Sequence, residues 1–266
     1  MQHLVAHHLG CSRIDLYVQF DRPLPEEDLA PLREALRRRA EGVPLQHLLG
    51  DIEFHRRTFR CDPRALIPRP ETEELAELLA AAHAPPPGSR ILDLGCGSGV
   101  LGLTLAAEWP QSRATLADIS PDALALAREN AEALEIENAE FIESDLFSNL
   151  DGAGFDLIAA NLPYVPERDR DSLSPEVLHD PPLALFGGPD GLDILRRAIP
   201  EAIRHLAPGG LLALEIGHDQ ASETAALLEA AGFAEIEIRS DLSGVPRFPL
   251  ARKPPPAPSE NLKPNP

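Results

Sequence analysis

The stretch that decides the fold is ILDLGCGSG, from Ile91 to Gly99. Its first four positions predict a buried strand, and its three glycines let the backbone turn sharply into a helix predicted for residues 100–109. Such a turn allows the backbone to approach a nucleotide-like ligand closely at the end of a strand. Glycine-rich turns also arise for packing reasons, so these nine residues alone support a ligand site only weakly.

Asp118 strengthens the prediction of a ligand site. It ends the next predicted strand, residues 114–117, about twenty residues after the glycine turn, where a carboxylate can accept hydrogen bonds from ribose hydroxyls. A cofactor that contains a nucleoside is therefore favoured over a packing loop. A dinucleotide is the competing interpretation, because GxGxxG is formally matched by Gly97, Gly99 and Gly102. That pattern begins two residues too late after the predicted strand, so a dinucleotide fits the sequence less well than a single nucleoside.

A further carboxylate, Asp145, follows the third predicted strand in the stretch FIESDLF. An adenine amino group would lie at this place in a bound nucleoside cofactor. A helix cap is an equally good interpretation of this aspartate when it is taken by itself.

The tetrapeptide Asn161-Leu162-Pro163-Tyr164 follows the apolar run FDLIAA, residues 155–160. It supplies an aromatic ring and two carbonyl acceptors, the side-chain oxygen of Asn161 and the backbone oxygen of Leu162. An amide or exocyclic amine is a poor nucleophile because its lone pair is delocalised, so a site must hold its two N–H bonds and orient the lone pair. The tetrapeptide therefore predicts methyl transfer to a planar NH2 group. The alternative for Tyr164 is a packing role at the strand end.

Strand-like and helix-like segments alternate from residue 90 onward, which predicts an α/β fold with a parallel sheet covered on both faces. Seven strands are expected, at residues 91–94, 114–117, 140–143, 156–160, 211–216, 234–238 and 248–251. Helices are expected between them, at residues 100–109, 120–134, 191–206 and 221–231.

Residues 1–49 are expected to form a small helical domain, with helices at residues 4–9, 13–20 and 28–40. Asp28 is the expected cap of the third helix, which puts Pro31 in its first turn. A hairpin is predicted within DIEFHRRTFRC, so that residues 50–65 link the helical domain to the sheet domain at residues 66–253. The proline-rich tail, residues 254–266, has too few apolar residues to order itself and is expected to be disordered.

The net charge of −19 disfavours nucleic acid as a partner, because phosphate binding needs Lys and Arg to displace counterions. A local cationic patch is conceivable at Arg33, Arg37, Arg38 and Arg39. The solvated face of a helix is the more common origin of such a run.

The compartment is expected to be the cytoplasm. No apolar stretch approaches the roughly 20 residues that cross a bilayer, and the first ten residues lack the features of a signal peptide. Cys11, Cys61 and Cys96 are isolated in sequence, which indicates neither a disulfide framework nor a metal site. A monomer without membrane association is the expected state.

Two longer motifs, LIPRPETE from Leu66 and ALFGGPDGLD from Ala184, are far more specific than the glycine turn. Together with EGVPLQHLLGDIEF, SDLF and LAPGGLLALEIG, they make the chain resemble the PrmC/HemK-type glutamine N5-methyltransferases of peptide chain release factors. The resemblance runs from about Leu4 to Lys253 and implies a Rossmann-like, seven-stranded methyltransferase sheet.

The resemblance also implies the cofactor, the substrate and their residues. S-adenosyl-L-methionine would be the methyl donor, with S-adenosyl-L-homocysteine as product, and the acceptor would be the glutamine of the Gly-Gly-Gln motif in peptide chain release factors. The implied cofactor-binding residues are Gly95, Cys96, Gly97, Ser98, Gly99, Asp118, Asp145, Leu146 and Asn161. The implied catalytic and substrate-binding residues are Asn161, Leu162, Pro163 and Tyr164. Arg69 and Thr72 are implied to lie near the cofactor entrance.

The chain departs from the family pattern in two places. Leu162 stands where the family usually has proline, in a tetrapeptide also seen in enzymes resembling ribosomal-RNA adenine N6-dimethyltransferases. Pro163 still biases Leu162 towards an extended backbone, so the carbonyl acceptor is retained. The family's helical domain usually begins earlier, and an upstream helix is expected to be missing here.

Two other functions are weighed against this one. An adenine N6-methyltransferase acting on RNA or DNA is favoured by Leu162 alone and opposed by the acidic charge. A non-catalytic binding module is disfavoured by the intact Asp118 and Asn161. The expected reaction is an in-line displacement by the amide nitrogen, which needs neither a metal nor a strong base.

Overall fold

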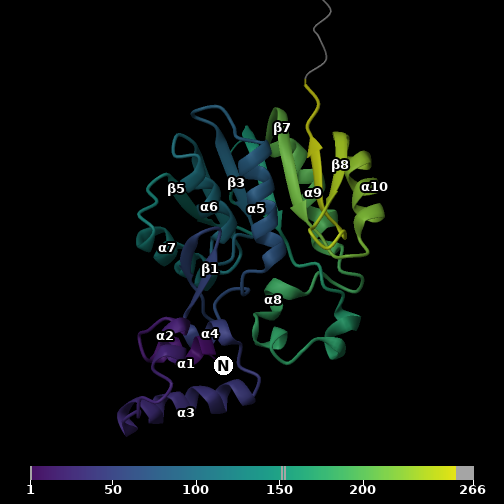
Figure 1. The fold of residues 1–266 in the computed structure, drawn as a ribbon. Helices are drawn as coiled ribbons and strands as arrows, with labels where there is room; N and C mark the ends of the chain where they lie inside the picture. Colours follow the sequence, from purple (N-terminus) through teal and green to yellow (C-terminus); the bar gives the residue numbers. More distant parts are fainter. Residues whose placement is uncertain (1, 151, 153, 256–266) are drawn as a thin grey trace, which may run out of the picture.

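A seven-stranded sheet forms the centre of the computed structural model, which describes residues 2–150, 152 and 154–255 (Figure 1). The strand order is β5-β4-β3-β6-β7-β9-β8. The strands are β3 (Arg90–Leu94), β4 (Arg113–Asp118), β5 (Ala139–Glu143), β6 (Phe155–Asn161), β7 (Leu206–Glu215), β8 (Ala234–Ser240) and β9 (Pro246–Arg252). Every strand expected from the sequence is present, and the α/β class is confirmed.

The sheet is mixed, and the expectation of a purely parallel sheet is wrong at one edge. The strands β5, β4, β3, β6 and β7 are parallel, whereas β9 pairs antiparallel with both β7 and β8. The cause is the short connection 241–245 between β8 and β9, because a turn of that length can join only antiparallel neighbours. Asp241 holds this turn by accepting hydrogen bonds from the backbone N–H groups of Ser243 and Val245.

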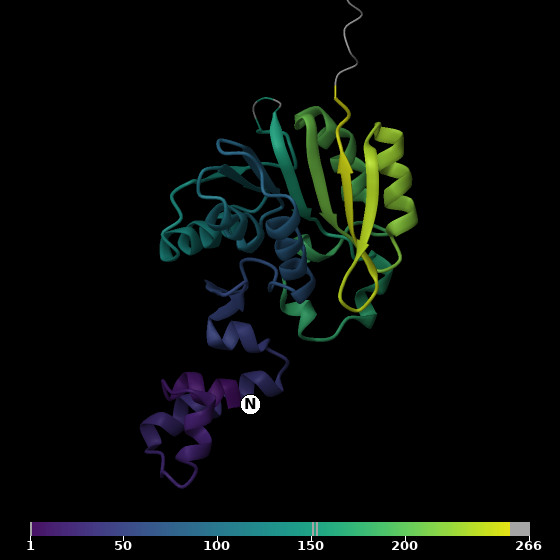
Figure 2. The same cartoon turned by 45° about the horizontal axis from the view of Figure 1, so that its top comes forward.

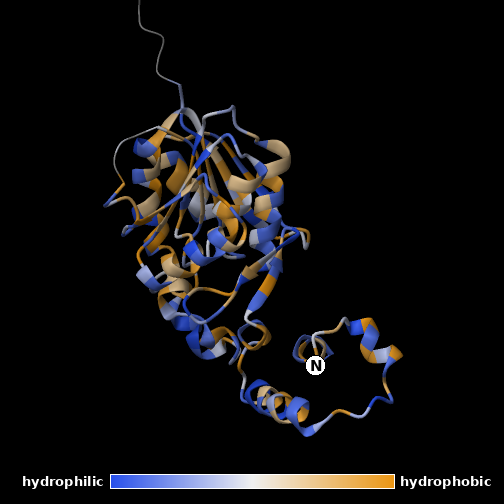
Figure 3. Cartoon of the chain, turned by 90° about the vertical axis from the view of Figure 1, so that its left-hand side faces the viewer, coloured by the Kyte–Doolittle hydropathy of each residue, from blue (hydrophilic) through white to orange (hydrophobic). Residues whose placement is uncertain are grey.

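Helices cover both faces of the sheet. Side chains of α5 (Pro70–Ala82), α6 (Val100–Glu108) and α7 (Pro121–Ala133) pack in one apolar cluster, and those of α9 (Asp193–His205) and α10 (Ala221–Ala231) pack in the other. Successive strand residues point to opposite faces. Accordingly, Ile91 of β3 lies in the first cluster and Leu92 and Leu94 lie in the second. Apolar residues dominate the strands between the two helical layers (Figure 3).

The N-terminal helices stand apart from the sheet, as Figure 2 shows. They are α1 (Gln2–His8), α2 (Arg13–Val18), α3 (Glu26–Ala40) and α4 (Leu45–Leu49). Leu4, Leu32 and Ala35 form a small core of their own there. An antiparallel pair, β1 (Asp51–Phe54) and β2 (Arg57–Arg60), connects these helices to α5 and the sheet.

Several helix ends differ from the sequence prediction. The third helix begins at Glu26 after Pro25, so Asp28 lies inside it and is not its cap, and Pro31 falls beyond the first turn. The first two helices end at His8 and Val18, earlier than expected. Helix bounds are predicted from the spacing of apolar residues, and the polar residues near helix ends carry little of that pattern. Shifts of this size in the first and last helical residue follow from this.

The helix expected at residues 191–206 is shorter than predicted. Gly191 has a φ of +81°, which a helix does not accommodate, so α9 begins at Asp193. At the other end, Leu206 is already the first residue of β7.

A long connection, residues 162–192, runs between β6 and α9 and contains η1 (Glu167–Ser172), η2 (Val177–His179) and α8 (Pro182–Leu185). Ion pairs tie it to the rest of the molecule, because Glu176 contacts Arg39 of α3 and Asp180 contacts Arg69. This connection lies below the sheet and beside the N-terminal helices in Figure 1.

Two sequence expectations concern the ends and the environment of the chain. Most of the tail predicted to be disordered, residues 256–266, lies outside the described residues. None of the helices in the described ranges is long and apolar enough to cross a membrane.

Candidate functional site

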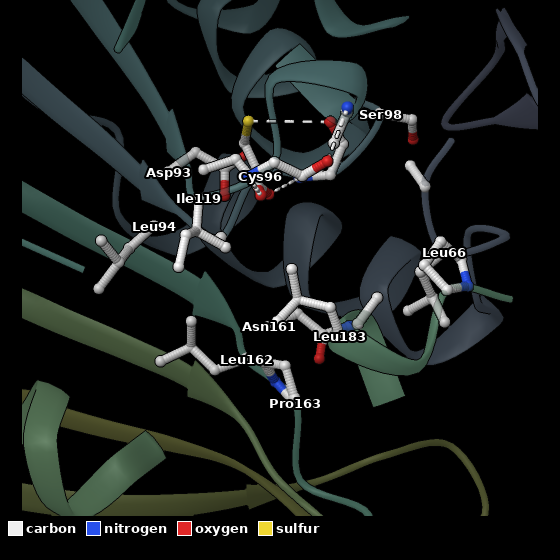
Figure 4. Close-up of a pocket in the computed structure, with 18 of the residues that line it drawn as sticks. Leu66, Asp93, Leu94, Cys96, Ser98, Ile119, Asn161, Leu162, Pro163 and Leu183 are labelled. Carbon is white, nitrogen blue, oxygen red and sulfur yellow. Dashed lines mark hydrogen bonds between the residues drawn. The ribbon is translucent and has the colours of Figure 1, made fainter. Parts of the chain in front are cut away.

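A cavity of about 230 Å³ opens at the carboxyl ends of β3, β4 and β6. Asp93, Cys96 and Ser98 lie on one side of it, and Asn161, Leu162 and Pro163 lie on the other (Figure 4). The cavity brings together most of the residues singled out in the sequence: Gly95, Cys96, Gly97, Ser98, Asp118, Asp145, Leu146, Asn161, Leu162, Pro163 and Thr72. Gly99, Tyr164 and Arg69 do not line it.

The glycine turn has a backbone that other residues could not easily adopt. Gly95, Gly97 and Gly99 have φ angles of +74°, +54° and +83°. At Gly95, an added Cβ would lie 2.8 Å from the Cδ2 atom of Leu162. Gly99 faces the packed side of the turn, where an added Cβ would come within 3.2 Å of three side chains, including Leu116 of β4. Gly99 thus joins the turn to the core.

Asp118 holds the glycine turn in place from the end of β4. Its Oδ2 accepts a hydrogen bond from the Gly97 N–H at 2.8 Å, and its Oδ1 accepts one from the Ser120 N–H at 2.9 Å. Burial raises the pKa of this carboxyl, while the backbone N–H groups of Ser120, Gly97 and Ile119 act in the opposite direction. A carboxylate has about four acceptor sites, so Asp118 keeps acceptor capacity while lining the cavity, which suits a ligand with hydroxyl groups.

Asp93 is a site residue that the sequence reasoning missed. It is 1% exposed, lines the cavity, and accepts a hydrogen bond through Oδ2 from the Gly102 N–H at 2.7 Å. Its Oδ1 is buried without a partner among the described residues, and burial raises its pKa to about 7. An unpaired buried carboxylate oxygen is costly unless a ligand completes it. The available signal was an acid in the middle of the apolar strand ILDL.

Asp145 lies at the rim of the cavity beside Leu146. Its Oδ2 forms an ion pair with Arg197 of α9 at 2.7 Å, and both residues line the cavity. The next residue, Leu146, has a φ of +51°, so the chain turns at this point. Asp145 is not a helix cap, because a turn follows it and the next element is β6.

A chain of hydrogen bonds runs from Asn161 through Thr72, which also lines the cavity, to Glu215, which does not. The Nδ2 of Asn161 donates to the Oγ1 of Thr72 at 2.9 Å, and the Thr72 hydroxyl donates to the Oε2 of Glu215 at 2.7 Å. Glu215 ends β7, is 1% exposed, and has a pKa raised by burial to about 7. Sequence reasoning gave Glu215 no role, although it too is an acid inside an apolar run, LLALEIG.

The rest of the tetrapeptide is divided between the cavity and the core. Leu162 is buried and packs against Gly95, and Pro163 lines the cavity. Tyr164 lies outside the cavity lining, and its hydroxyl donates to the Oε1 of Glu215 at 3.3 Å. The stacking of Tyr164 on a substrate amide stays a prediction. Arg69 pairs with the buried Asp180, and the neighbouring residues Pro68 and Pro181 line the cavity. Its place near the cofactor entrance stays a prediction.

These residues fit a cofactor with a nucleoside at one end and a positive charge at the other. The turn would clash with a Cβ at Gly95, Asp93 has an unpaired oxygen, and Asp118 has free lone pairs. The apolar part of the lining includes Leu66, Ile119 and Leu183 (Figure 4). No group of three metal-ligating side chains occurs in the described ranges.

Comparison with known proteins places this site in a family. Residues 71–185 match the Methyltransferase small domain, and residues 1–50 match the PrmC N-terminal domain. A release factor glutamine methyltransferase of Deinococcus radiodurans is 43% identical, over 94% of this chain and 89% of that protein. One from Koribacter versatilis is 39% identical over the same shares. The chain belongs to the release factor glutamine methyltransferase family.

Solved structures support the fold of this family member. The 16S rRNA N2 G1207 methyltransferase of Thermus thermophilus, in complex with AdoMet and guanosine, has a TM-score of 0.57 and 20% identity, covering 76% of this chain and 49% of that one. The ribosomal protein L11 methylase of Lactobacillus delbrueckii has a TM-score of 0.54 and 22% identity, covering 74% of this chain and 85% of that one. At this identity the likeness shows the methyltransferase fold alone.

Proposed function

We propose that this enzyme transfers a methyl group from S-adenosyl-L-methionine to the side-chain amide nitrogen, N5, of the glutamine in the Gly-Gly-Gln motif of peptide chain release factors. The observation that carries the proposal is the hydrogen bonding of Asn161. Its NH2 group is engaged by Thr72, and its Oδ1 is left without a partner among the described residues, on a side chain that lines the cavity. The glutamine NH2 group that receives the methyl group donates hydrogen bonds, so it needs a carbonyl oxygen that is free to accept one.

The residues proposed to hold the cofactor supply complementary groups. The unpaired Oδ1 of Asp93 would accept a hydrogen bond from the ammonium group of the methionine part, and Asp118 would accept from the ribose hydroxyls. Leu146 would lie beside the adenine, with Asp145 at the rim. When bound, S-adenosyl-L-methionine supplies an electrophilic methyl group on a positively charged sulfur.

The residues proposed to hold the substrate orient its lone pair. The Oδ1 of Asn161 and the backbone oxygen of Leu162 would each accept one N–H of the glutamine amide. Pro163 restricts Leu162 to an extended backbone and so keeps its carbonyl in one direction. The extra proton of the alkylated amide passes readily to water, so no protein base is required.

The helical region at residues 1–49 is proposed to dock the release factor. It stands apart from the sheet on the side where the connection 162–192 lies, and it exposes Ile14, Tyr17, Val18 and Phe20. Contiguous exposed apolar residues of this kind mark interaction surfaces. The net charge of −19 favours a basic partner, and the cytoplasm, where release factors act, is the proposed compartment.

The experiment that tests this function offers the enzyme two acceptors. The purified protein is incubated with S-adenosyl-L-methionine labelled in the methyl group, together with a purified release factor and ribosomal RNA. Label in the release factor supports the proposal. Label in the RNA, with the release factor unmodified, would move the assignment to the adenine N6-methyltransferase that Leu162 alone suggests.

A further inference from the structure

Three elements converge beside Asn161 at the wall of the cavity, where Thr72 is also a lining residue. Asn161 ends β6 and lies opposite Glu215, which ends the neighbouring parallel strand β7, so their side chains share one face of the sheet. Thr72, in the first turn of α5, reaches between them. Thr72 and Glu215 are both buried, at 4% and 1% exposed.

The chemistry of these groups gives the hydrogen-bond chain a direction. An ionised carboxylate only accepts hydrogen bonds, so the Thr72 hydroxyl must give its single proton to Glu215. The oxygen of Thr72 can then only accept, and Asn161 must turn its NH2 group towards it. Glu215 receives its second hydrogen bond from the Tyr164 hydroxyl. The orientation of the Asn161 amide therefore follows from a charge two hydrogen bonds away.

We propose that Glu215 and Thr72 are positioning residues that hold the Asn161 amide with Oδ1, and not Nδ2, available to the substrate. The inference rests on the proposed function, in which Oδ1 accepts an N–H of the glutamine amide. An Asn161 amide rotated by 180° would place its NH2 group against the NH2 group of the substrate. Two donors would face each other and the acceptor would be lost.

The surroundings of Glu215 couple this orientation to pH. Burial raises the pKa of Glu215 to about 7, hydrogen bonds from Thr72 and Tyr164 oppose the rise, Glu71 of α5 adds to it, and Arg247 of β9 opposes it. A protonated Glu215 can donate to Thr72, whose hydroxyl is then free to donate to Asn161. The direction of the chain reverses, and the amide turns its oxygen towards Thr72.

The first test compares two substitutions of Thr72. Thr72→Val keeps the shape but removes the hydroxyl, whereas Thr72→Ser keeps the hydroxyl. With saturating cofactor and a purified release factor, Thr72→Val should lower kcat by about 10–100-fold while the Kd for S-adenosyl-L-methionine stays within about threefold. Thr72→Ser should restore kcat to within a few-fold of wild type.

A matched control is Thr224→Val in α10. Thr224 is fully buried, and its hydroxyl has no partner among the described residues. This variant should have the wild-type kcat, because it removes a buried hydroxyl without touching the chain to Asn161. The comparison separates the effect of removing any buried threonine hydroxyl from the effect of removing the hydroxyl of Thr72.

The second test is the pH profile of kcat. The measurement uses saturating cofactor, because Asp93 also has a raised pKa and its titration would alter cofactor binding. At saturation that effect no longer contributes to the pH profile of kcat. The wild-type kcat should fall as pH drops below about 7, by about tenfold per unit. In Glu215→Gln the side chain can accept from Thr72 and donate to Tyr164 at every pH, so this fall should be absent.

The outcomes separate the inference from the function on which it rests. Wild-type kcat in Thr72→Val, a loss of cofactor affinity in that variant as large as its loss of kcat, or an unchanged pH profile in Glu215→Gln would each overturn the inference alone. A wild-type enzyme that leaves release factors unmethylated would overturn the proposed function as well.

Discussion

At the scale of single residues, the site depends on polar groups placed in apolar surroundings. Asn161 follows a buried stretch of β6, residues 157–160, and both Asp93 and Glu215 are acids with 1% exposure. Burying such groups is unfavourable unless each has a partner. Both oxygens of Glu215 accept hydrogen bonds within the protein, whereas the Oδ1 atoms of Asp93 and Asn161 have no partner among the described residues. A supporting group is fully paired inside the protein, and a binding group keeps an atom for a ligand.

The first prediction concerns Asn161→Ala. Loss of the side-chain carbonyl should lower kcat by about 10²–10³, the range for removing a preorganised polar contact. Cofactor affinity, measured by calorimetry, should stay within a few-fold, because Asp93 and Asp118 are unchanged. An equal loss of cofactor affinity and turnover would count against the role proposed for Asn161.

The second prediction concerns Leu162→Pro, which restores the tetrapeptide usual in the family. The backbone carbonyl is kept, so turnover should remain within a few-fold of wild type. Leu162 is 4% exposed and packs on Gly95, so the smaller proline should lower the free energy of unfolding by about 1–2 kcal/mol. Denaturant unfolding measures this cost. A large loss of turnover with unchanged stability would show that Leu162 has a direct part in the reaction.

At the scale of elements, the motif FGGPDGLD supports the tetrapeptide from outside the cavity. An added Cβ at Gly187 would lie 2.4 Å from the backbone oxygen of Pro163, and one at Gly191 would lie 2.2 Å from that of Tyr164. Gln220 adds to this support by donating to the backbone oxygen of Tyr164 at 3.0 Å. The motif is glycine-rich because it packs directly against the backbone that carries the site.

The third prediction follows from this packing. Gly187→Ala should displace Pro163 and with it the Leu162 carbonyl, lowering kcat by about tenfold or more while the Kd of S-adenosyl-L-methionine changes little. Steady-state kinetics and calorimetry check the two quantities. Unchanged kinetics in a folded variant would mean that the connection 162–192 moves without disturbing the tetrapeptide.

The sequence predicted the parallel part of the sheet well, because each strand is an apolar run followed by turn residues. It did not reveal the direction of β9, which depends on the short turn at residues 241–245, or the start of α9, which depends on the backbone of Gly191. Motif positions singled out Asn161 and Asp118, both of which line the cavity. Asp93 and Glu215 were missed because their importance lies in burial and partners, which a linear pattern does not show.

At the scale of the whole molecule, the site carries a cost in stability that varies with pH. Glu215 has a pKa raised to about 7 in the folded protein, against 4.5 for an ordinary glutamate. The folded state therefore holds one more proton than the unfolded state between these values. The stability contributed by neutral Glu215 is complete below about pH 4.5 and is lost as pH rises through about 7.

The fourth prediction is that Glu215→Gln removes this pH dependence. The difference in unfolding free energy between the variant and wild type should favour the variant more at pH 8 than at pH 5, by about 2–3 kcal/mol. Denaturant titrations at the two pH values measure it, with Glu77→Gln, an exposed position on α5, as the control. A pH-independent difference would mean that Glu215 is ionised throughout this range.

The central claim, that the Asn161 site methylates a glutamine amide of a release factor, is tested most directly by mass spectrometry. A release factor co-expressed with this enzyme should carry one added methyl group on the glutamine of its Gly-Gly-Gln motif. Co-expression with Asn161→Ala should leave that glutamine largely unmodified. A methyl group on a different residue, or an unmodified release factor beside the wild-type enzyme, would contradict the account.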